Sequence, residues 1–157
     1  MNEKEIREMI KEKGVDNVDW RKISMTLGLS EDFIREFKHY VNWDYISYDQ
    51  ILSEDFIREF DNILDWSTVS SEQELSEDFI REYKDKLKWD RISAMQTLSE
   101  DFIREFQNIV DWKEISYYQK LSEDFIREFS NKVDWKSIFE RQTLSDKFKE
   151  EFKNRLK

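Results

Sequence analysis

The stretch that decides the fold is LSEDFIREFKHYVNWDYISYDQI, residues 29–51, because it recurs along the chain. Its first eight residues, LSEDFIRE, return at Leu52, Leu75, Leu98 and Leu121, always 23 residues apart, and a degenerate copy, LSDKFKEE, begins at Leu144. A fixed period of this length is the signature of a repeat architecture. The tryptophans keep the same period, so we predict that each fills one core position of its repeat: Trp20, Trp43, Trp66, Trp89, Trp112 and Trp135.

The first half of the repeat predicts a helix. Ser30 is a typical N-cap residue, and Glu31 and Asp32 place negative charge in the first turn, where the helix dipole favours it. The apolar residues that follow have helical spacing along one face: Phe33, Ile34, Phe37 and Val41. We therefore expect a helix of about 11 residues with one buried stripe.

The second half predicts another helix, capped by Asn42 and carrying Trp43, Ile46 and Gln50 on its buried face. Helices of about 11 and nine residues are too short to be stable alone in water. Stacked hairpins bury the missing surface, because each repeat then packs on its neighbours. The sequence thus predicts an all-α fold, an α-solenoid of 23-residue helix-turn-helix repeats.

The ends of the chain depart from the repeat as end caps should. We expect one helical-repeat domain over residues 1–157, with an N-terminal cap and half repeat (1–28), five repeats (29–143) and a C-terminal cap helix (144–157). In the last copy, Lys149 and Glu150 replace the Ile and Arg of LSEDFIRE, which makes the outer face polar. At the front, we align Ile6 with the Leu of that motif, and Gly14 allows the first helix to end.

Polar residues that recur in every copy are predicted to be structural. The arginine of LSEDFIRE can pair with the glutamate four residues before it and with acids of the next repeat. The carboxylates suit helix starts, and their repetition argues against a catalytic pair, which needs one special environment. The buried stripe of the second helix carries glutamines that we expect to bond backbone groups between repeats, with Leu27 in their place in the first copy: Gln50, Gln73, Gln96, Gln119 and Gln142.

Composition excludes several classes of function. The chain has no Cys and a single His, His39, which removes thiolate nucleophiles, catalytic triads and the usual zinc sites. Its formal net charge of −10 disfavours nucleic acid and anionic membranes as partners, and no apolar run reaches membrane-spanning length. We therefore expect a cytoplasmic protein that is not an enzyme and binds no metal or cofactor.

The repeat also resembles known sequences. LSEDFIREF followed by a VDW-like turn is similar to short α-helical tandem repeats in uncharacterised proteins of large DNA viruses, phages and other mobile elements, and the likeness covers about residues 15–152. The resemblance implies a helical-repeat fold and a viral or phage origin, hence location in the host cytoplasm. It carries over no functional residue.

Function should lie in positions that vary between copies. The outer positions of the second helix carry tyrosines and a methionine that solvent exposure alone does not require, and we expect them to line one surface: Tyr45, Tyr48, Met95, Tyr117 and Tyr118. Residues 52–74 have a net charge of −6, to which four acids of that copy contribute: Asp61, Asp65, Glu72 and Glu74. We predict that both sets bind another protein with a basic surface.

Two other interpretations remain open at the level of sequence. Regularly spaced carboxylates could mimic nucleic acid and block a DNA- or RNA-binding enzyme, and such binding should weaken steeply with salt. The array could also be a structural spacer. The interpretation as a non-catalytic inhibitor or adaptor differs from both in requiring aromatic contacts.

Overall fold

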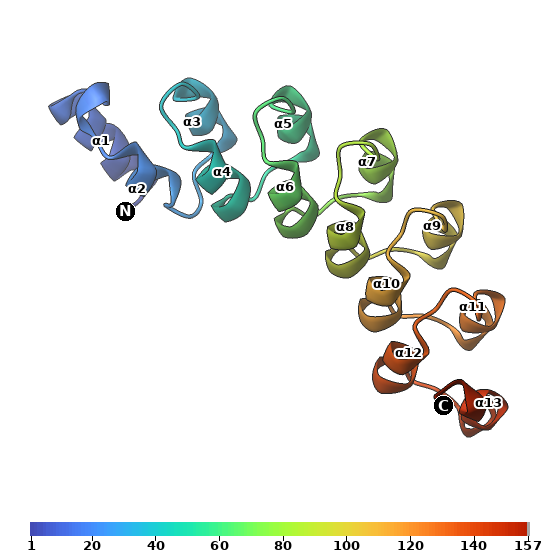
Figure 1. Cartoon of the computed structure of the whole chain (residues 1–157). Helices are drawn as coiled ribbons and strands as arrows, with labels where there is room; N and C mark the ends of the chain where they lie inside the picture. The colour runs from blue at the N-terminus through green and yellow to red at the C-terminus, as the bar shows by residue number, and fades with distance from the viewer. Residues whose placement is uncertain (157) are drawn as a thin grey trace. The chain divides into compact units, whose positions relative to one another are not determined.

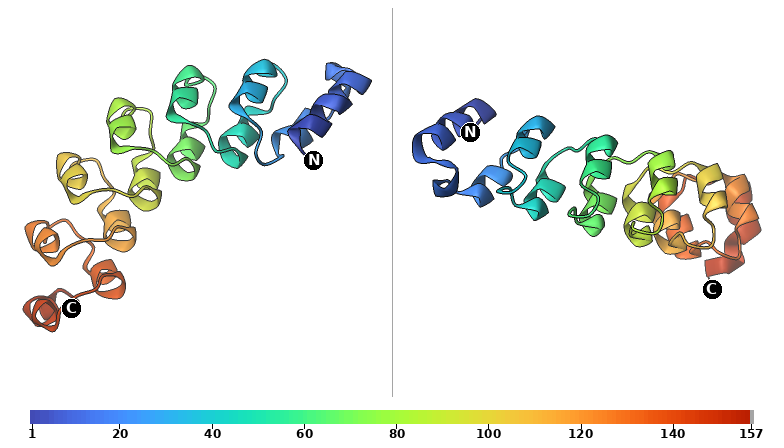
Figure 2. Two further views of the ribbon diagram at one scale, coloured as in Figure 1. Left: turned by 180° about the vertical axis from the view of Figure 1, so that it is seen from behind. Right: turned by 90° about the horizontal axis from the view of Figure 1, so that it is seen from above.

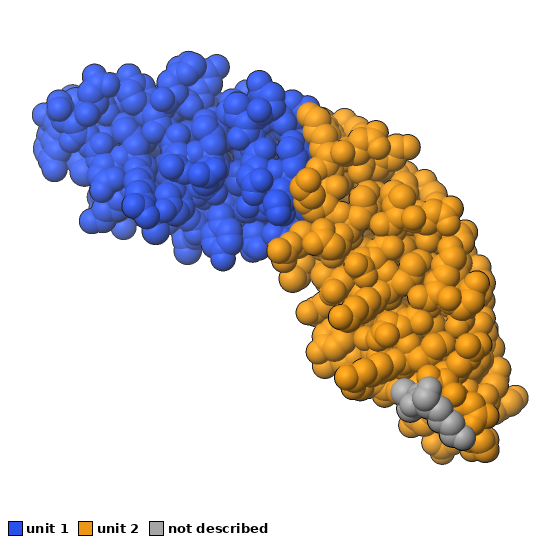
Figure 3. Space-filling view, viewed as in Figure 1, with its two compact units in different colours: residues 1–73 blue, residues 74–157 orange. Residues whose placement is uncertain are grey.

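The computed structural model describes residues 1–156 and confirms an all-α repeat fold, with no strand in that range. Lys157, the last residue of the expected C-terminal cap, lies outside the described residues. The chain divides into two compact units, Met1–Gln73 (unit 1) and Glu74–Lys157 (unit 2), coloured separately in Figure 3. Both units consist of the same repeat, and each is described by itself.

In unit 1, short helices alternate between two rows. The elements, in chain order, are α1 (Glu3–Lys13), the 3-10 helix η1 (Val15–Asn17), α2 (Trp20–Ser24), α3 (Glu31–Glu36), α4 (Trp43–Asp49), α5 (Glu54–Glu59) and α6 (Trp66–Glu72). Helices α2, α4 and α6 pack side by side, and α3 and α5 form the other row (Figure 1).

Unit 2 continues the pattern. Its elements are α7 (Glu77–Glu82), α8 (Trp89–Met95), α9 (Glu100–Glu105), α10 (Trp112–Tyr118), α11 (Glu123–Glu128), α12 (Trp135–Arg141), α13 (Asp146–Phe152) and the 3-10 helix η2 (Lys153–Leu156). Helices α8, α10 and α12 are neighbours in one row, and the rows stay separate when seen from behind (Figure 2).

The helices start where the sequence predicts, but the first helix of each repeat is shorter than expected. The Ser30 hydroxyl accepts a hydrogen bond from the Phe33 N–H at 3.1 Å, as an N-cap should. Helix α3 then has six residues instead of about 11, because Phe37 leaves helical geometry with φ −106° and ψ 24°. The amides of Tyr40 and Val41 both bond to the Phe37 carbonyl, so a turn satisfies the backbone in place of further helix.

The tryptophans hold one position in every repeat and pack on buried phenylalanines, but each is only half-buried and lies at the edge of the core. The ring centroid of Trp43 lies 4.8 Å from that of Phe60 and 6.4 Å from that of Phe56, both in the next repeat. The Trp43 indole N–H donates to the Lys38 carbonyl at 3.1 Å, which holds one ring edge at the surface turn. The fully buried aromatic of each repeat is instead the Phe33-type residue.

The glutamines bond backbone groups of neighbouring repeats, as predicted. The Gln119 amide donates to the carbonyls of Ser93 and Gln96, each at 2.8 Å, and its oxygen accepts from the Leu98 N–H at 3.1 Å. Gln50 and Gln142 make the same kind of triple contact. The expectation for Leu27 was wrong, because this residue is 76% exposed where α2 ends early and Gly28 has φ 82°.

The recurring serines of the second helix do more than allow close packing. The Ser24 hydroxyl donates to the Trp20 carbonyl at 2.7 Å and accepts from the Asn42 N–H of the next repeat at 2.9 Å. The same pair of bonds is made by Ser116, to Trp112 and from Asp134. These fully buried hydroxyls therefore join successive second helices.

The arginines form the predicted ladder of ion pairs. Arg35 pairs with Glu31 at 3.4 Å in its own helix and with Glu59 of the next repeat at 2.7 Å. Its guanidinium carbon also lies 5.0 Å from the ring centroid of Phe56, a cation–π contact that the sequence did not reveal. The hydrogen bond that Arg35 donates to the Glu59 carboxylate raises the pKa of Arg35 above its ordinary value.

At the N-terminus the expected register was wrong. Glu3 accepts a hydrogen bond from the Ser30 N–H at 3.1 Å, and Arg7 pairs with Glu36 at 2.6 Å. These are the contacts that Glu31 and Arg35 make in the next repeat, so Ile6 matches Ile34 and not Leu29. The first repeat is thus five residues longer than the period predicts, and the 11-residue α1 accounts for the additional length. As expected, α1 ends before Gly14.

The C-terminal cap has the polar face that the sequence predicts. Lys149 and Glu150 are exposed on α13, whereas Phe148 is fully buried. Glu151 accepts the ion pair from Arg127 at 3.1 Å, which completes the ladder.

Candidate functional site

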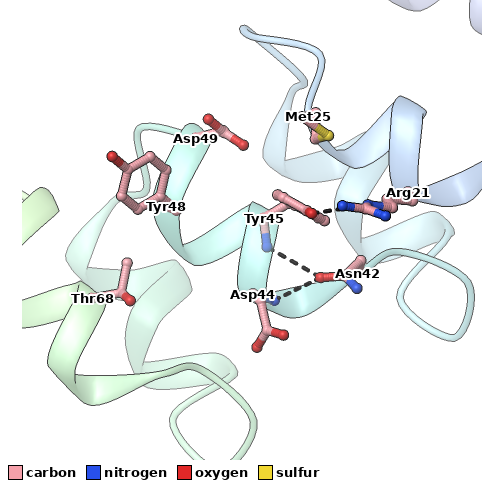
Figure 4. A pocket seen from close by; sticks show the side chains of 8 residues that line it. All are labelled: Arg21, Met25, Asn42, Asp44, Tyr45, Tyr48, Asp49 and Thr68. Atoms are coloured by element: carbon pink, nitrogen blue, oxygen red, sulfur yellow. Dashed lines mark hydrogen bonds between the residues drawn. The ribbon is translucent and has the colours of Figure 1, made fainter.

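The outer side of α4 in unit 1 forms a pocket with a volume of about 630 Å³. Tyr45, Tyr48 and Asp49 line it from α4, and Met25 comes from the turn after α2 (Figure 4). Arg21 of α2 and Thr68 of α6 complete the walls, so three successive second helices contribute. We call this the unit 1 pocket.

The two tyrosines of the unit 1 pocket have different environments. The Tyr45 hydroxyl accepts a hydrogen bond from Nε of Arg21 at 2.9 Å, and the Arg21 guanidinium carbon lies 5.5 Å from the Tyr45 ring centroid. Tyr45 is therefore half-buried and forms part of the pocket wall. Tyr48 is 62% exposed and Met25 is 48% exposed, so both offer apolar surface to a ligand.

Two carboxylates of the unit 1 pocket have no ion-pair partner within residues 1–156. Asp44 lies in the first turn of α4, where Asn42 caps the helix and negative charge is favourable. Asp49 is the last residue of α4, where the carbonyl end of the dipole opposes a negative charge, and its side chain is half-buried. Local structure thus explains Asp44 but gives no reason for Asp49.

The structure does not bring the predicted acidic residues into this pocket. Asp65 caps α6, where its carboxylate accepts from the Thr68 N–H at 3.0 Å. Glu72 ends α6 and accepts from the Ser71 hydroxyl at 3.0 Å, and the Asp61 carbonyl accepts from the Trp66 indole at 2.9 Å. Glu74 is exposed at the start of unit 2. The acids of the pocket are instead Asp44 and Asp49. In the sequence, the only signal for them is that their repeat positions vary between copies.

The remaining predicted residues lie in unit 2. Met95 is 53% exposed at the end of α8, and Tyr118 is 51% exposed at the end of α10. Tyr117 is half-buried beneath Arg141 of α12, with 4.4 Å between the guanidinium carbon and the ring centroid. The rings of Tyr117 and Tyr118 meet edge to face, 4.7 Å apart. Unit 1 and unit 2 therefore each present a tyrosine pair on their second helices.

The described residues form neither a metal-binding cluster nor a membrane-spanning helix. Residues 1–156 contain no group of three or more His, Asp or Glu side chains arranged to hold a metal ion. Within the same range, no helix combines the length and the apolar composition that crossing a membrane requires.

Comparisons with protein-family models, with curated proteins and with solved structures give no match to this chain. Its function therefore has to be inferred from its own residues.

Proposed function

We propose that this protein is a non-catalytic binding module that recognises a partner protein through the unit 1 pocket. One observation carries the proposal: exposed Tyr48 and Met25 share a pocket with the half-buried carboxylate of Asp49, which has no ion-pair partner within residues 1–156. A complementary partner has an apolar side chain at the centre of its contact and a basic residue beside it.

Recurring residues and variable residues have different roles in the fold, and this difference supports the proposal. The recurring Gln, Ser, Arg and Trp side chains are engaged in contacts between repeats, as Gln119, Ser24 and Arg35 show. The pocket residues Met25, Tyr48 and Asp49 take no part in those contacts, and they occupy two repeat positions whose residues vary between copies. Their identity is thus free to serve a ligand.

The ion-pair ladder favours protein binding over mimicry of nucleic acid. Carboxylates of the Glu31 and Asp32 type are each paired with the arginine of their own helix, as at Arg104 with Glu100 and Asp101. Each of these acids has a guanidinium nearby that offsets its negative charge. The row of carboxylates therefore resembles a nucleic-acid phosphate backbone less than the number of acidic residues suggests. An inhibitor or adaptor role, encoded by a virus or phage, accords with binding of this kind.

The test is capture of partners from cells that carry the protein, followed by affinity measurement with the purified candidate. We expect Tyr48→Ala to weaken binding about tenfold or more, as loss of an aromatic anchor does, without lowering the melting temperature. Ile63→Ala is the matched control, because Ile63 is exposed in the same unit but lines a different pocket. Equal losses for both variants, or none for Tyr48→Ala, would contradict the proposal.

Salt dependence separates this proposal from nucleic-acid mimicry. An interface centred on Tyr48 should keep most of its affinity between low and moderate salt, since apolar contacts are not screened. An affinity that falls by orders of magnitude over that range, while Tyr48→Ala binds normally, would support mimicry instead.

A further inference from the structure

A second pocket, in unit 2, has the opposite charge. It has a volume of about 370 Å³, lies beside Tyr117 and Tyr118, and is bordered by Lys120 and Arg141. No acidic residue lines it, although the chain as a whole has a net charge of −10. We call it the unit 2 pocket, and it is distinct from the site of the proposed function.

The cations of the unit 2 pocket are without acceptors. Within residues 1–156, neither Lys120 nor Arg141 has a carboxylate partner or a side-chain hydrogen bond, and the hydroxyls of Tyr117 and Tyr118 have no partner either. The Arg141 guanidinium rests on the Tyr117 ring, with 4.4 Å between its carbon and the ring centroid, and this contact holds it at the pocket wall. The pocket therefore offers several N–H and O–H donors that no group of the described chain uses.

Helix stability does not account for these cations. Arg141 ends α12, where positive charge suits the dipole, but the same position holds Asp49, Glu72, Met95 and Tyr118 in other repeats. Helices α4, α6, α8 and α10 nevertheless have the same length as α12, seven residues, and a glutamine at the C-cap as it does. The repeat thus folds equally with an acid, a thioether or a phenol where Arg141 stands.

We propose that the unit 2 pocket binds the carboxylate of an acidic side chain presented by a peptide segment of another protein. A guanidinium is a planar fork that can bind both carboxylate oxygens, and Lys120 supplies a second charge on the same side. The tyrosine rings offer apolar surface to the methylene groups of the acidic side chain. The volume lies near the lower end of the range of ligand pockets, about 300–1,000 Å³, which suits a single side chain.

The test uses an acetylated, amidated pentapeptide with two glutamates and the same peptide with two glutamines. The protein is labelled with 3-fluorotyrosine, and its fluorine resonances are assigned by Tyr→Phe variants. We expect the glutamate peptide to shift the resonances of Tyr117 and Tyr118 in a saturable manner and to leave that of Tyr48 in place. The glutamine peptide should produce no saturable shift.

Variants locate the site. Arg141→Gln should weaken binding of the glutamate peptide about tenfold, as expected for a lost charge-assisted hydrogen bond, and Arg141→Lys should restore part of it. Arg91→Gln is the matched control, because it removes one exposed positive charge from α8 of the same unit, outside the pocket. Circular dichroism confirms that each variant is folded.

Three results would overturn the inference: equal shifts with both peptides, equal weakening by Arg91→Gln and Arg141→Gln, or tighter binding of inorganic phosphate than of the peptide at the same two resonances. The last would assign the pocket to phosphate. None of these results bears on the unit 1 pocket, whose test uses Tyr48 and a different ligand charge.

Discussion

At the scale of single residues, two aspartates of α4 show that the position of a negative charge decides whether it stabilises or destabilises the helix. Asp44 lies in the first turn and Asp49 at the last residue of the same helix, so the dipole favours one and opposes the other. Neither carboxylate has an ion-pair partner within residues 1–156 to mask that difference. A residue that costs stability without local compensation is the expected mark of a binding function.

We predict that Asp49→Asn raises the free energy of unfolding by about 0.3–1 kcal/mol at low salt, because it removes a negative charge from the carbonyl end of α4. Asp44→Asn should lower it by a similar amount. Urea denaturation of the two variants beside the parent measures both effects. If Asp49→Asn were the destabilising variant, the carboxylate would have a structural role, and the stability argument for the unit 1 pocket would fail.

The buried glutamines provide a second prediction at this scale. Gln119→Leu keeps the side-chain size but leaves the Ser93 and Gln96 carbonyls and the Leu98 N–H without their partner. Each unsatisfied buried group costs about 1–3 kcal/mol, so the loss should exceed about 2 kcal/mol in total. Thr97→Val, an exposed substitution in the same unit, should change the free energy of unfolding by less than about 0.5 kcal/mol. A loss below about 1 kcal/mol for Gln119→Leu would show that water replaces the glutamine.

At the scale of the helices, caps and turns hold each short element in place. Helix α12 is capped by Asp134, whose carboxylate accepts from the Ser137 hydroxyl at 2.6 Å and from the Ser137 N–H at 2.9 Å. These bonds, the hydroxyl first, lower the pKa of Asp134 below its ordinary value of 3.8. A seven-residue helix has little stability of its own, so its cap and its neighbours decide whether it forms.

The sign of the pKa shift fixes a pH dependence. Because the pKa is lower in the folded state, the carboxylate of Asp134 stabilises the fold above about pH 4, and this contribution is lost as the pH falls through the folded-state pKa. We expect the melting temperature to drop between pH 7 and pH 3, and to drop less in Asp134→Asn, which cannot lose this charge. Scanning calorimetry across the range tests this, and identical pH profiles for the two proteins would refute it.

At the scale of the whole molecule, stability comes from contacts between successive repeats. Within unit 2, α10 packs on both α8 and α12, and each Arg of the ladder reaches the following repeat. Such an array behaves as a chain of nearest-neighbour interactions, in which one repeat can be removed without loss of the pattern. Both ends keep their caps when the removed segment lies inside.

We predict that deletion of residues 75–97, one repeat in register, leaves a folded helical protein with a lower free energy of unfolding. The junction joins Glu74 to Leu98, the same step that Glu74 to Leu75 makes in the parent. Far-ultraviolet circular dichroism and urea titration measure the outcome. The control is a deletion of about half a repeat, residues 75–86, which joins Glu74 to Leu87, breaks the register and should unfold. A disordered in-register deletion would contradict the nearest-neighbour description.

The sequence by itself determined the all-α fold, the period and the start of every helix from α2 to α13, because caps, dipoles and apolar spacing act within a few residues. It also indicated the glutamine bonds and the arginine ladder, since both follow from one repeat stacked on the next. Only the tertiary structure decided that Trp43 is half-buried and that α1 carries five additional residues. It also decided that two aspartates line the unit 1 pocket beside Tyr48, whereas Lys120 and Arg141 border the unit 2 pocket beside Tyr118. These features depend on which side chains of adjacent repeats meet in space, and a linear pattern does not contain that information.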